Sequence, residues 1–391
     1  MVAIRLTRTG AKVHWRDGST MQESAALTAP FRLFGADLSP YAAKARAYLH
    51  FKGLDYVWTP RSLANQDDFA RFAKLPLAPV LVDAEDHALQ DSTPMLEALE
   101  AQFPEPSMLP GDAGVRFLSA LFEDYADEWL NKAMFHYRWS YEADRDSASA
   151  RTRDMLYDND AAPEDAAQTI ASRMASRLHH VGSSPENAPA IEASFARLVA
   201  ALEKLFAGGS LYLLGGRPCF GDFGIYGQLR QLLSDPTPGA MLREEAPATV
   251  RWIERMDSPK VEGDFISFAE ARAAFADVLA RELAIAYLPW AASNSEAVAE
   301  DAMSVRVEIG EVTFVQKPQR YAAKAFAELR RKRAEAGGHE GLSELLQDSG
   351  CAQFLDLDSE DEAEEGREGS ASDEAQEAAG GDRDGAEGEE D

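Results

Sequence analysis

Two serine side chains stand where helices begin, and this position suits them for chemistry. Ser39 precedes Pro40, and Ser92 follows Asp91 at the start of an apolar helical pattern. The first N–H groups of a helix and the helix dipole favour a negative charge, so either serine could help to hold an anionic group. Both sites also fit an ordinary helix start, in which a polar side chain caps the helix and proline occupies its first position.

The cysteines and histidines indicate no metal centre. Cys219 and Cys351 are the two cysteines of the sequence, and they form neither a CxxC pair nor a metal-binding spacing. The seven histidines include His179 and His180 but no HExxH pattern. This composition is typical of a reducing compartment, so we expect a cytoplasmic protein without a metal cofactor.

The charge balance argues against nucleic acid as a partner. The 391 residues carry a net charge of −28, whereas a nucleic-acid-binding protein needs a basic surface. Residues 356–391 hold 17 acidic and two basic residues, so −15 of the charge lies there. No apolar stretch reaches 18 residues, and the first twenty residues lack the apolar core of a secretory signal. We therefore expect no membrane span.

The segment from Phe31 to Gln102 predicts a small α/β domain. The expected elements are a strand at 31–34, a helix at 40–52, a strand at 56–60, a short helix at 66–72, a strand at 80–82, its hairpin partner at 87–90 and a helix at 91–102. This order is the thioredoxin-like one, in which helices cover both faces of the sheet.

Strand patterns almost vanish for about 150 residues after the Pro-rich linker that begins at Phe103, so the second half is expected to be an all-α bundle. A small α+β extension follows, in which Val305, Val307 and Ile309 alternate with charged residues as in a β-hairpin, and a basic helix spans 321–334. The predicted organisation is a flexible arm at 1–29, a thioredoxin-like domain at 30–105, a helical domain at 112–265, the extension at 266–335 and a disordered acidic tail at 356–391.

Several segments resemble glutathione transferases in their order and spacing. They are ADLSPYAAKARAYLHFKGLDY at 36–56, LAPVLVD at 77–83, LQDSTPMLEALEAQFPE at 89–105 and PCFGDFGIYGQL at 218–229. The stretch 285–330 is similar to the extended C-terminal region of some larger bacterial members. The resemblance covers roughly residues 30–335. It implies a homodimer that binds glutathione as co-substrate and conjugates it to a small electrophile, the chemistry of detoxification.

The resemblance assigns roles in the first domain. SPYA at 39–42 occupies the place of the thioredoxin redox motif, but Ser39 and Ala42 replace both cysteines, so this motif cannot exchange disulfides. The resemblance implies that Ser39 donates a hydrogen bond to the glutathione thiolate, with Tyr41 as the second candidate donor. It also implies that Ala78, before a cis Pro79, offers its backbone to the cysteinyl part. Asp91 and Ser92 would hold the ammonium and carboxylate of the γ-glutamyl part.

The helical half supplies further candidates. In the family, the helix after the linker lines the electrophile pocket, so the resemblance implies that Tyr137 and Trp139 form an apolar wall and that Arg138 holds an anionic group. The same cluster also fits a core with one satisfied ion pair, in which Asp124, Asp127 or Glu128 would be the partner of Arg138. Asp222 matches the structural capping aspartate of the family, although Cys219 stands where a serine or threonine is usual.

The leading hypothesis is a Ser-type glutathione transferase. The alternative is a non-catalytic binding or scaffold protein that retains the transferase fold, because a fold alone does not decide function. A thiol oxidoreductase is disfavoured by Ser39. The basic helix at 321–334 contains Arg330, Arg331, Lys332 and Arg333. These residues fit either a solvated helix end or a patch on which the acidic tail folds back or competes with an anionic partner.

Truncation at Leu355 is expected to leave the thermal midpoint nearly unchanged. Residues 356–391 contain no aromatic residue and are dominated by Glu, Asp, Gly, Ala and Ser, so they cannot bury enough surface to offset the entropy of ordering. Differential scanning calorimetry of the full and truncated chains tests this, and a midpoint lower by many degrees in the truncated chain contradicts it.

Overall fold

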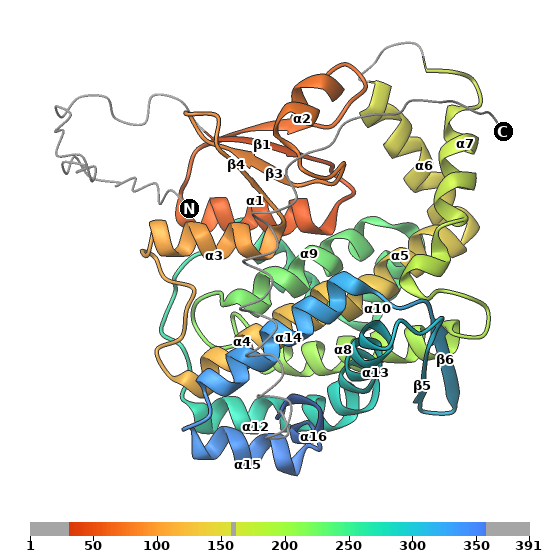
Figure 1. Cartoon of the computed structure of the whole chain (residues 1–391). Coiled ribbons are helices and arrows are strands. Elements are labelled where there is room, and N and C mark those ends of the chain that lie inside the picture. Colours follow the sequence, from red (N-terminus) through yellow and green to blue (C-terminus); the bar gives the residue numbers. More distant parts are fainter. Residues whose placement is uncertain (1–30, 158–161, 357–391) are drawn as a thin grey trace, which may run out of the picture.

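A computed structural model describes residues 31–157 and 162–356, and it confirms the predicted fold class within them. The arm expected at 1–29 and the acidic tail from residue 357 onward lie outside the described residues. Asp356, the first residue of the expected tail, lies inside them, and its carboxylate is 3.0 Å from Arg333 Nε. Figure 1 shows the sheet at one end of the molecule and the helical half beneath it.

The first half is a four-stranded mixed sheet with helices on both faces. Its strands lie in the order β2-β1-β3-β4, with β1 and β2 parallel and the other pairs antiparallel. The elements are β1 (Phe31–Gly35), α1 (Pro40–Lys52), β2 (Tyr56–Pro60), α2 (Gln66–Phe72), β3 (Val80–Val82), β4 (Ala88–Gln90) and α3 (Ser92–Gln102). The sequence-based boundaries of these elements differ from the observed ones by at most one residue.

Alternation along the strands divides the first half between two apolar clusters. Leu33 and Leu81 belong to the main core on the side of α1 and α3. Phe34 and Val80 point to the opposite face, where they pack against Phe69 of α2. Successive residues of a strand face opposite sides of a sheet, so this period of two fixes which face meets the helical half.

The helical half contains α4 (Ala113–Tyr125), the π-helical segment η1 (Ala126–Leu130), α5 (Asn131–Ser140), α6 (Glu142–Tyr157), α7 (Ala166–Ala175), the 3-10 turn η2 (Leu178–Val181), α8 (Ala188–Ala207), α9 (Phe220–Ser234), α10 (Pro236–Glu245) and α11 (Pro247–Met256). The apolar spacing of the sequence predicts one continuous helix over 115–139, but the structure has η1 within it. It also did not predict α6, whose sequence EADRDSASARTRDMLY has no clear apolar stripe and buries few residues.

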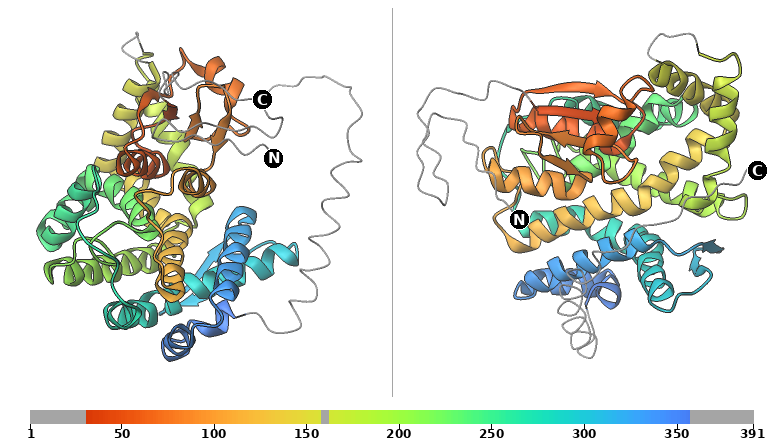
Figure 2. Two further views of the ribbon diagram at one scale, coloured as in Figure 1. Left: turned by 90° about the vertical axis from the view of Figure 1, so that its left-hand side faces the viewer. Right: turned by 45° about the horizontal axis from the view of Figure 1, so that its top comes forward.

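The extension packs along the helical half. It comprises α12 (Phe268–Val278), the π-helical segment η3 (Leu279–Tyr287), α13 (Leu288–Ala299), β5 (Val305–Ile309), β6 (Val312–Gln316), α14 (Arg320–Glu335), α15 (Glu340–Asp348) and α16 (Ala352–Leu355). The predicted hairpin and basic helix are present, and α14 lies beside α4 (Figures 1 and 2). Two further helices follow α14, and they bury Leu342, Leu346 and Leu355.

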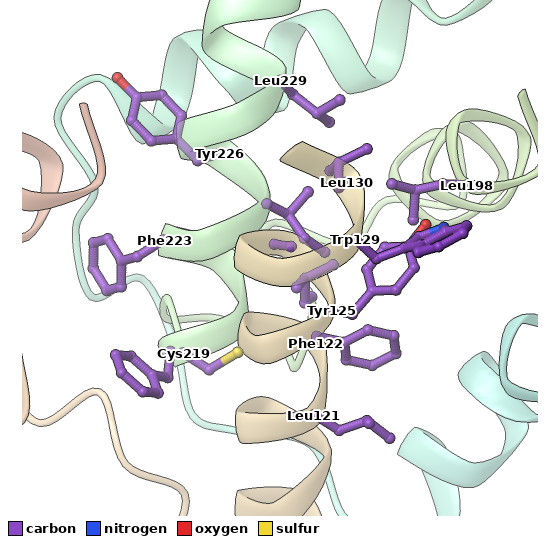
Figure 3. Close-up of a cluster of buried hydrophobic side chains, with 14 of the residues drawn as sticks. Leu121, Phe122, Tyr125, Trp129, Leu130, Leu198, Cys219, Phe223, Tyr226 and Leu229 are labelled. Carbon is purple, nitrogen blue, oxygen red and sulfur yellow. The ribbon is translucent and has the colours of Figure 1, made fainter. Parts of the chain in front are cut away.

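The main core joins the halves. Figure 3 shows Phe122, Tyr125 and Trp129 of α4 and η1 among side chains of α8 and α9. Helices α1 and α9 approach so closely that a Cβ on Gly227 of α9 would lie 2.6 Å from the Pro40 carbonyl oxygen. A larger residue at 227 would therefore push the two halves apart.

Asp222 is a buried structural acceptor at the start of α9. Its carboxylate accepts hydrogen bonds from Cys219 N and Leu213 N, both at 2.9 Å, and from Trp252 Nε1 at 3.2 Å. The Asp222 carboxylate accepts a hydrogen bond from the Cys219 backbone N–H at the helix start. This half of the capping arrangement therefore forms even though Cys219 replaces the usual serine or threonine.

Replacing Asp222 by alanine is expected to lower the free energy of unfolding by about 3 kcal/mol, because three buried donors lose their acceptor. Asp222→Asn is the matched control, since it keeps one oxygen acceptor and should lose less. Urea denaturation of the parent and both variants measures the effect. A loss in Asp222→Ala below about 1 kcal/mol contradicts this role.

Candidate functional site

A cavity of about 360 Å³ lies where the first half, the η1–α5 region and the extension meet. We call it the central cavity. Its lining includes Tyr41, Ala78, Pro79, Asp91 and Ser92 from the first half, Asp127, Glu128, Asn131 and Lys132 from η1 and α5, His180 and Val181 from η2, and Trp290, Gln316 and Tyr321 from the extension. Five of the six residues predicted for catalysis or glutathione binding therefore share one cavity.

The loop before β3 is held by one amide side chain. Gln90 Oε1 accepts hydrogen bonds from Lys74 N at 2.8 Å and Leu75 N at 3.0 Å, and its Nε2 donates to Leu75 O and Leu77 O, both at 2.7 Å. The Ala78–Pro79 peptide that follows is cis, which confirms the sequence prediction. Gln90 thereby fixes the backbone that leads into the cavity wall.

Asp91 and Ser92 form the start of α3 at the cavity wall. Asp91 has φ 80° and ψ 125°, a strained conformation for a residue other than glycine, and its side chain does not cap α3. Tyr321 of the extension donates a hydrogen bond to Asp91 Oδ2. Since Asp91 leaves the first N–H groups of α3 uncapped, they are available to an anionic ligand.

Ser39 and Tyr41 occupy different positions at the start of α1. Ser39 caps the helix, since its Oγ accepts a hydrogen bond from Ala42 N at 3.2 Å, and it does not belong to the cavity lining. Tyr41 lines the cavity, but its hydroxyl donates to Asp127 O at 3.2 Å and accepts from Asn131 Nδ2 at 3.4 Å. Burial, followed by repulsion from Asp127, raises the pKa of Tyr41 above its ordinary value, which makes its hydroxyl a weaker acid.

A buried charge network lies behind the cavity wall, and the sequence reasoning missed it. The Lys44 ammonium of α1 contacts the carboxylates of Glu123 and Asp127, the latter at 2.6 Å, and Thr93 Oγ1 at 3.1 Å. Burial alone would lower the pKa of Lys44, but Asp127 and Glu123 raise it, so the lysine stays charged. A signal was present in the sequence, because Lys44 falls on the buried side of its helix, next to Ala45 and Tyr48.

Lys132 of α5 also lines the central cavity. Its ammonium is 3.8 Å from the centre of the Trp290 ring and 3.1 Å from Gln316 Oε1. The side chain is buried, and burial lowers the pKa of Lys132 to about 7 even though Glu128 opposes the shift. Burial also raises the pKa of Glu128 well above its usual range, with Asp124 and Asp127 adding repulsion.

The structure places the predicted electrophile-binding residues Tyr137, Arg138 and Trp139 in the interior, outside the cavity lining. Arg138 Nε is 2.7 Å from Asp235 Oδ2, and its Nη1 donates to Leu38 O at 2.6 Å. This placement matches the core ion pair, but the partner of Arg138 is Asp235 and not the expected Asp124, Asp127 or Glu128. Arg138 therefore fixes the backbone next to Ser39, and Asn131 and Lys132 of the same helix line the cavity instead.

A group of exposed side chains could offer three metal ligands. Atoms of Asp83, Glu85 and His87 lie within 4.8 Å of one another. The Asp83 carboxylate already accepts from Glu85 N and His87 N, and its other oxygen is 3.0 Å from His87 Nδ1. These internal bonds account for the geometry of the β3–β4 turn, and none of the three residues lines the central cavity.

No helix of the described residues has both the length and the apolar character needed to cross a membrane.

Two protein families match the chain. The family "Glutathione S-transferase, N-terminal domain" matches residues 33–107, and "Glutathione S-transferase, C-terminal domain" matches residues 185–255. The first match contains the sheet, α1 and the Ala78–Pro79 and Asp91–Ser92 segments. The second contains Asp222.

Curated relatives resemble part of the chain. Glutathione S-transferase Z2 of Arabidopsis thaliana is 34% identical over 88 residues, which are 22% of this chain and 39% of the relative. Glutathione S-transferase 1 of Dianthus caryophyllus is 33% identical over 100 residues, which are 25% of this chain and 45% of the relative. The chain thus spans less than half the length of these two relatives.

Similar solved structures include glutathione transferase GSTFuA3 from Phanerochaete chrysosporium, with 18% identity, a TM-score of 0.42 and coverage of 59% of this chain and 97% of that one. A glutathione S-transferase from Methylobacterium radiotolerans, solved in complex with glutathione sulfonate, is 21% identical with a TM-score of 0.36 and coverage of 64% and 94%.

Replacing Lys44 by methionine is expected to lower the free energy of unfolding by about 3–5 kcal/mol, because two buried carboxylates lose their cation. Lys324→Met removes an exposed lysine and should change stability by about 0.5 kcal/mol at most. Chemical denaturation of both variants compares the two effects. Equal stability of Lys44→Met and Lys324→Met contradicts the structural role of the network.

Proposed function

We propose that this chain is a member of the glutathione S-transferase family, binds glutathione in the central cavity and conjugates it to an electrophile. One observation carries the proposal: the Ala78–Pro79 backbone and the uncapped start of α3 at Asp91–Ser92 meet in one cavity. These groups come from separate elements, and each suits a different part of glutathione.

The α3 start supports a site for the γ-glutamyl end. Ser92 supplies a hydroxyl and a helix-terminal N–H for the γ-glutamyl carboxylate, and Asp91 supplies a carboxylate for the ammonium. The Ala78 backbone supplies peptide hydrogen bonds to the cysteinyl part. Tyr321 already bonds Asp91, so it either shares this carboxylate with glutathione or gives way to the ligand.

Ser39 is the better of the two candidates for thiol activation. Its Oγ accepts a hydrogen bond from Ala42 N, and no acceptor for its own proton is present among the described residues. The Tyr41 hydroxyl is engaged with the Asp127 carbonyl and would have to leave it. A Ser39 hydroxyl at a helix start can stabilise a thiolate with its proton, assisted by the helix dipole. Since Ser39 stands outside the cavity lining, we propose that the thiol of bound glutathione lies at the edge of the cavity toward α1.

The proposed reaction is a nucleophilic attack by sulfur. The glutathione thiol gives its proton to solvent, the thiolate forms a carbon–sulfur bond with the electrophile, and the leaving group departs with its electron pair. Leu77, Val181 and Trp290 supply an apolar surface for the electrophile in place of Tyr137 and Trp139.

Replacing Ser39 by alanine is expected to lower kcat with a generic aryl halide about 10- to 150-fold, while the Kd for glutathione changes little. The hydroxyl bonds more strongly to a thiolate than to a thiol, so its loss affects mainly the chemical step. The range corresponds to one charge-assisted hydrogen bond. Conjugation kinetics and calorimetric titration of the same preparations measure both quantities.

Ser92→Ala is the matched control, since it removes the same hydroxyl from the start of α3. Ser92→Ala should weaken glutathione binding more than it lowers kcat, because the Ser92 hydroxyl contacts a part of glutathione that does not react. A Ser39→Ala variant with unchanged kinetics and a thermal midpoint lowered by a lost cap leaves Ser39 with a structural role only.

A further inference from the structure

Lys132 differs from the other buried lysines in having no carboxylate partner. Lys44 pairs with Glu123 and Asp127, and Lys52 Nζ is 2.6 Å from Glu100. Within residues 31–157 and 162–356, no carboxylate oxygen lies within 4.0 Å of the Lys132 ammonium. Its side chain is nevertheless only 3% exposed. A buried cation without a counter-ion is unfavourable, so this arrangement calls for an explanation.

The protein contacts of Lys132 leave part of its ammonium group unused. An ammonium has three N–H donors, and one of them reaches Gln316 Oε1 at 3.1 Å. The face of the Trp290 ring lies 3.8 Å from Nζ and supplies a cation–π contact. Both partners belong to the extension, and the Trp129 ring of η1 adds a longer contact, with its centre 5.4 Å from Nζ. These groups hold the lysine at the cavity wall without neutralising it.

The acidic residues of the cavity are engaged elsewhere. Asp127 bonds the Lys44 ammonium, and Asp91 accepts a hydrogen bond from the Tyr321 hydroxyl. Glu128 stands one helical turn before Lys132, beyond ion-pair distance, and its burial favours the neutral acid. His180 of η2 lines the same cavity and offers no negative charge.

We infer that the electrophile of this protein carries an anionic group, a carboxylate, which binds the Lys132 ammonium while the apolar part of the molecule packs on Trp290 and Val181. A ligand carboxylate supplies the counter-ion that the protein lacks, and the apolar side chains of Trp290 and Val181 line the same cavity as Lys132. The inference rests on the proposed function, since it names the substrate class of that same cavity.

The anionic group takes no part in bond formation. The glutathione thiolate attacks the electrophilic carbon, the carbon–sulfur bond forms, and the leaving group departs with its electron pair as the thiol proton passes to solvent. The carboxylate stays bound to Lys132 and orients the reacting carbon. Lys132 is therefore a specificity-determining residue, and its effect should depend on the charge of the electrophile.

Product analogues test this without relying on turnover. S-(4-carboxybenzyl)glutathione and S-(4-carbamoylbenzyl)glutathione differ only in a carboxylate and its neutral amide analogue. Calorimetric titration of the parent at pH 6.5 should give a Kd for the carboxylate at least about tenfold below that for the amide. This comparison uses the parent protein alone, so its result holds even if a substitution at Lys132 disturbs folding.

Variants at position 132 test whether Lys132 causes the preference for the carboxylate conjugate over the amide. Lys132→Met should abolish it and leave the Kd for unsubstituted glutathione unchanged, and Lys132→Arg should retain most of it because the charge is kept. Lys260→Met, which removes an exposed lysine, should behave as the parent does.

Three results overturn the inference. A parent that binds glutathione and both conjugates but shows no preference for the carboxylate excludes an anionic electrophile and leaves the proposed function intact. An equal loss of affinity for unsubstituted glutathione in Lys132→Met shows that Lys132 holds glutathione itself. A parent that binds neither glutathione nor either conjugate removes the proposed function, and the inference with it.

Discussion

The Lys44 ammonium, enclosed by the carboxylates of Glu123 and Asp127, is the interaction on which the geometry of the cavity depends. It joins α1 of the sheet domain to α4 and η1 of the helical half in the protein interior. Removing one partner of a buried ion pair leaves an uncompensated charge, so the three groups hold one another in place. The same ion pair fixes the position of Asp127. The backbone carbonyl of Asp127 accepts hydrogen bonds from Tyr41 and Asn131 at the cavity wall. Arg138, which bonds Leu38 O and Asp235, provides a second polar link between the halves.

The extension is an integral wall of the site. Asn294 holds the start of α14, since its side chain bonds Gln319 N at 2.7 Å and Gln319 O at 2.9 Å. Asn187 bonds the Val315 backbone and ties the hairpin to the helical half. These anchors bring Trp290, Gln316 and Tyr321 to the cavity, where they face Lys132 and Asp91. A chain without the extension would lack Tyr321 at the α3 start and the contacts of Lys132 with Gln316 and Trp290.

The sequence predicted those features whose causes are local. Turn residues, period-two strands and apolar helical spacing predicted the elements of the first half, whereas the cis peptide before Pro79 and the helix-capping carboxylate of Asp222 were expected from the resemblance to glutathione transferases. The π-helical segment η1 was not predictable, because its extra residue per turn leaves no composition signal. After that segment, Lys132 lines the cavity and Arg138 is buried against Asp235. The pairing of Lys44 with residues some 80 positions away depends on tertiary packing, which no local pattern encodes.

The central claim is that one cavity recognises glutathione through Asp91, Ser92 and the Ala78 backbone. Calorimetric titration of the full chain with reduced glutathione tests it most directly, with Asp91→Asn as the paired variant, because the amide keeps the shape of the side chain and removes the charge that meets the ammonium. The account predicts saturable binding at one site per chain and an affinity at least about tenfold lower in Asp91→Asn. If the parent gives no heat of binding at glutathione concentrations that would saturate a site with a millimolar Kd, this account is contradicted. That result favours a binding or scaffold protein that retains the transferase fold.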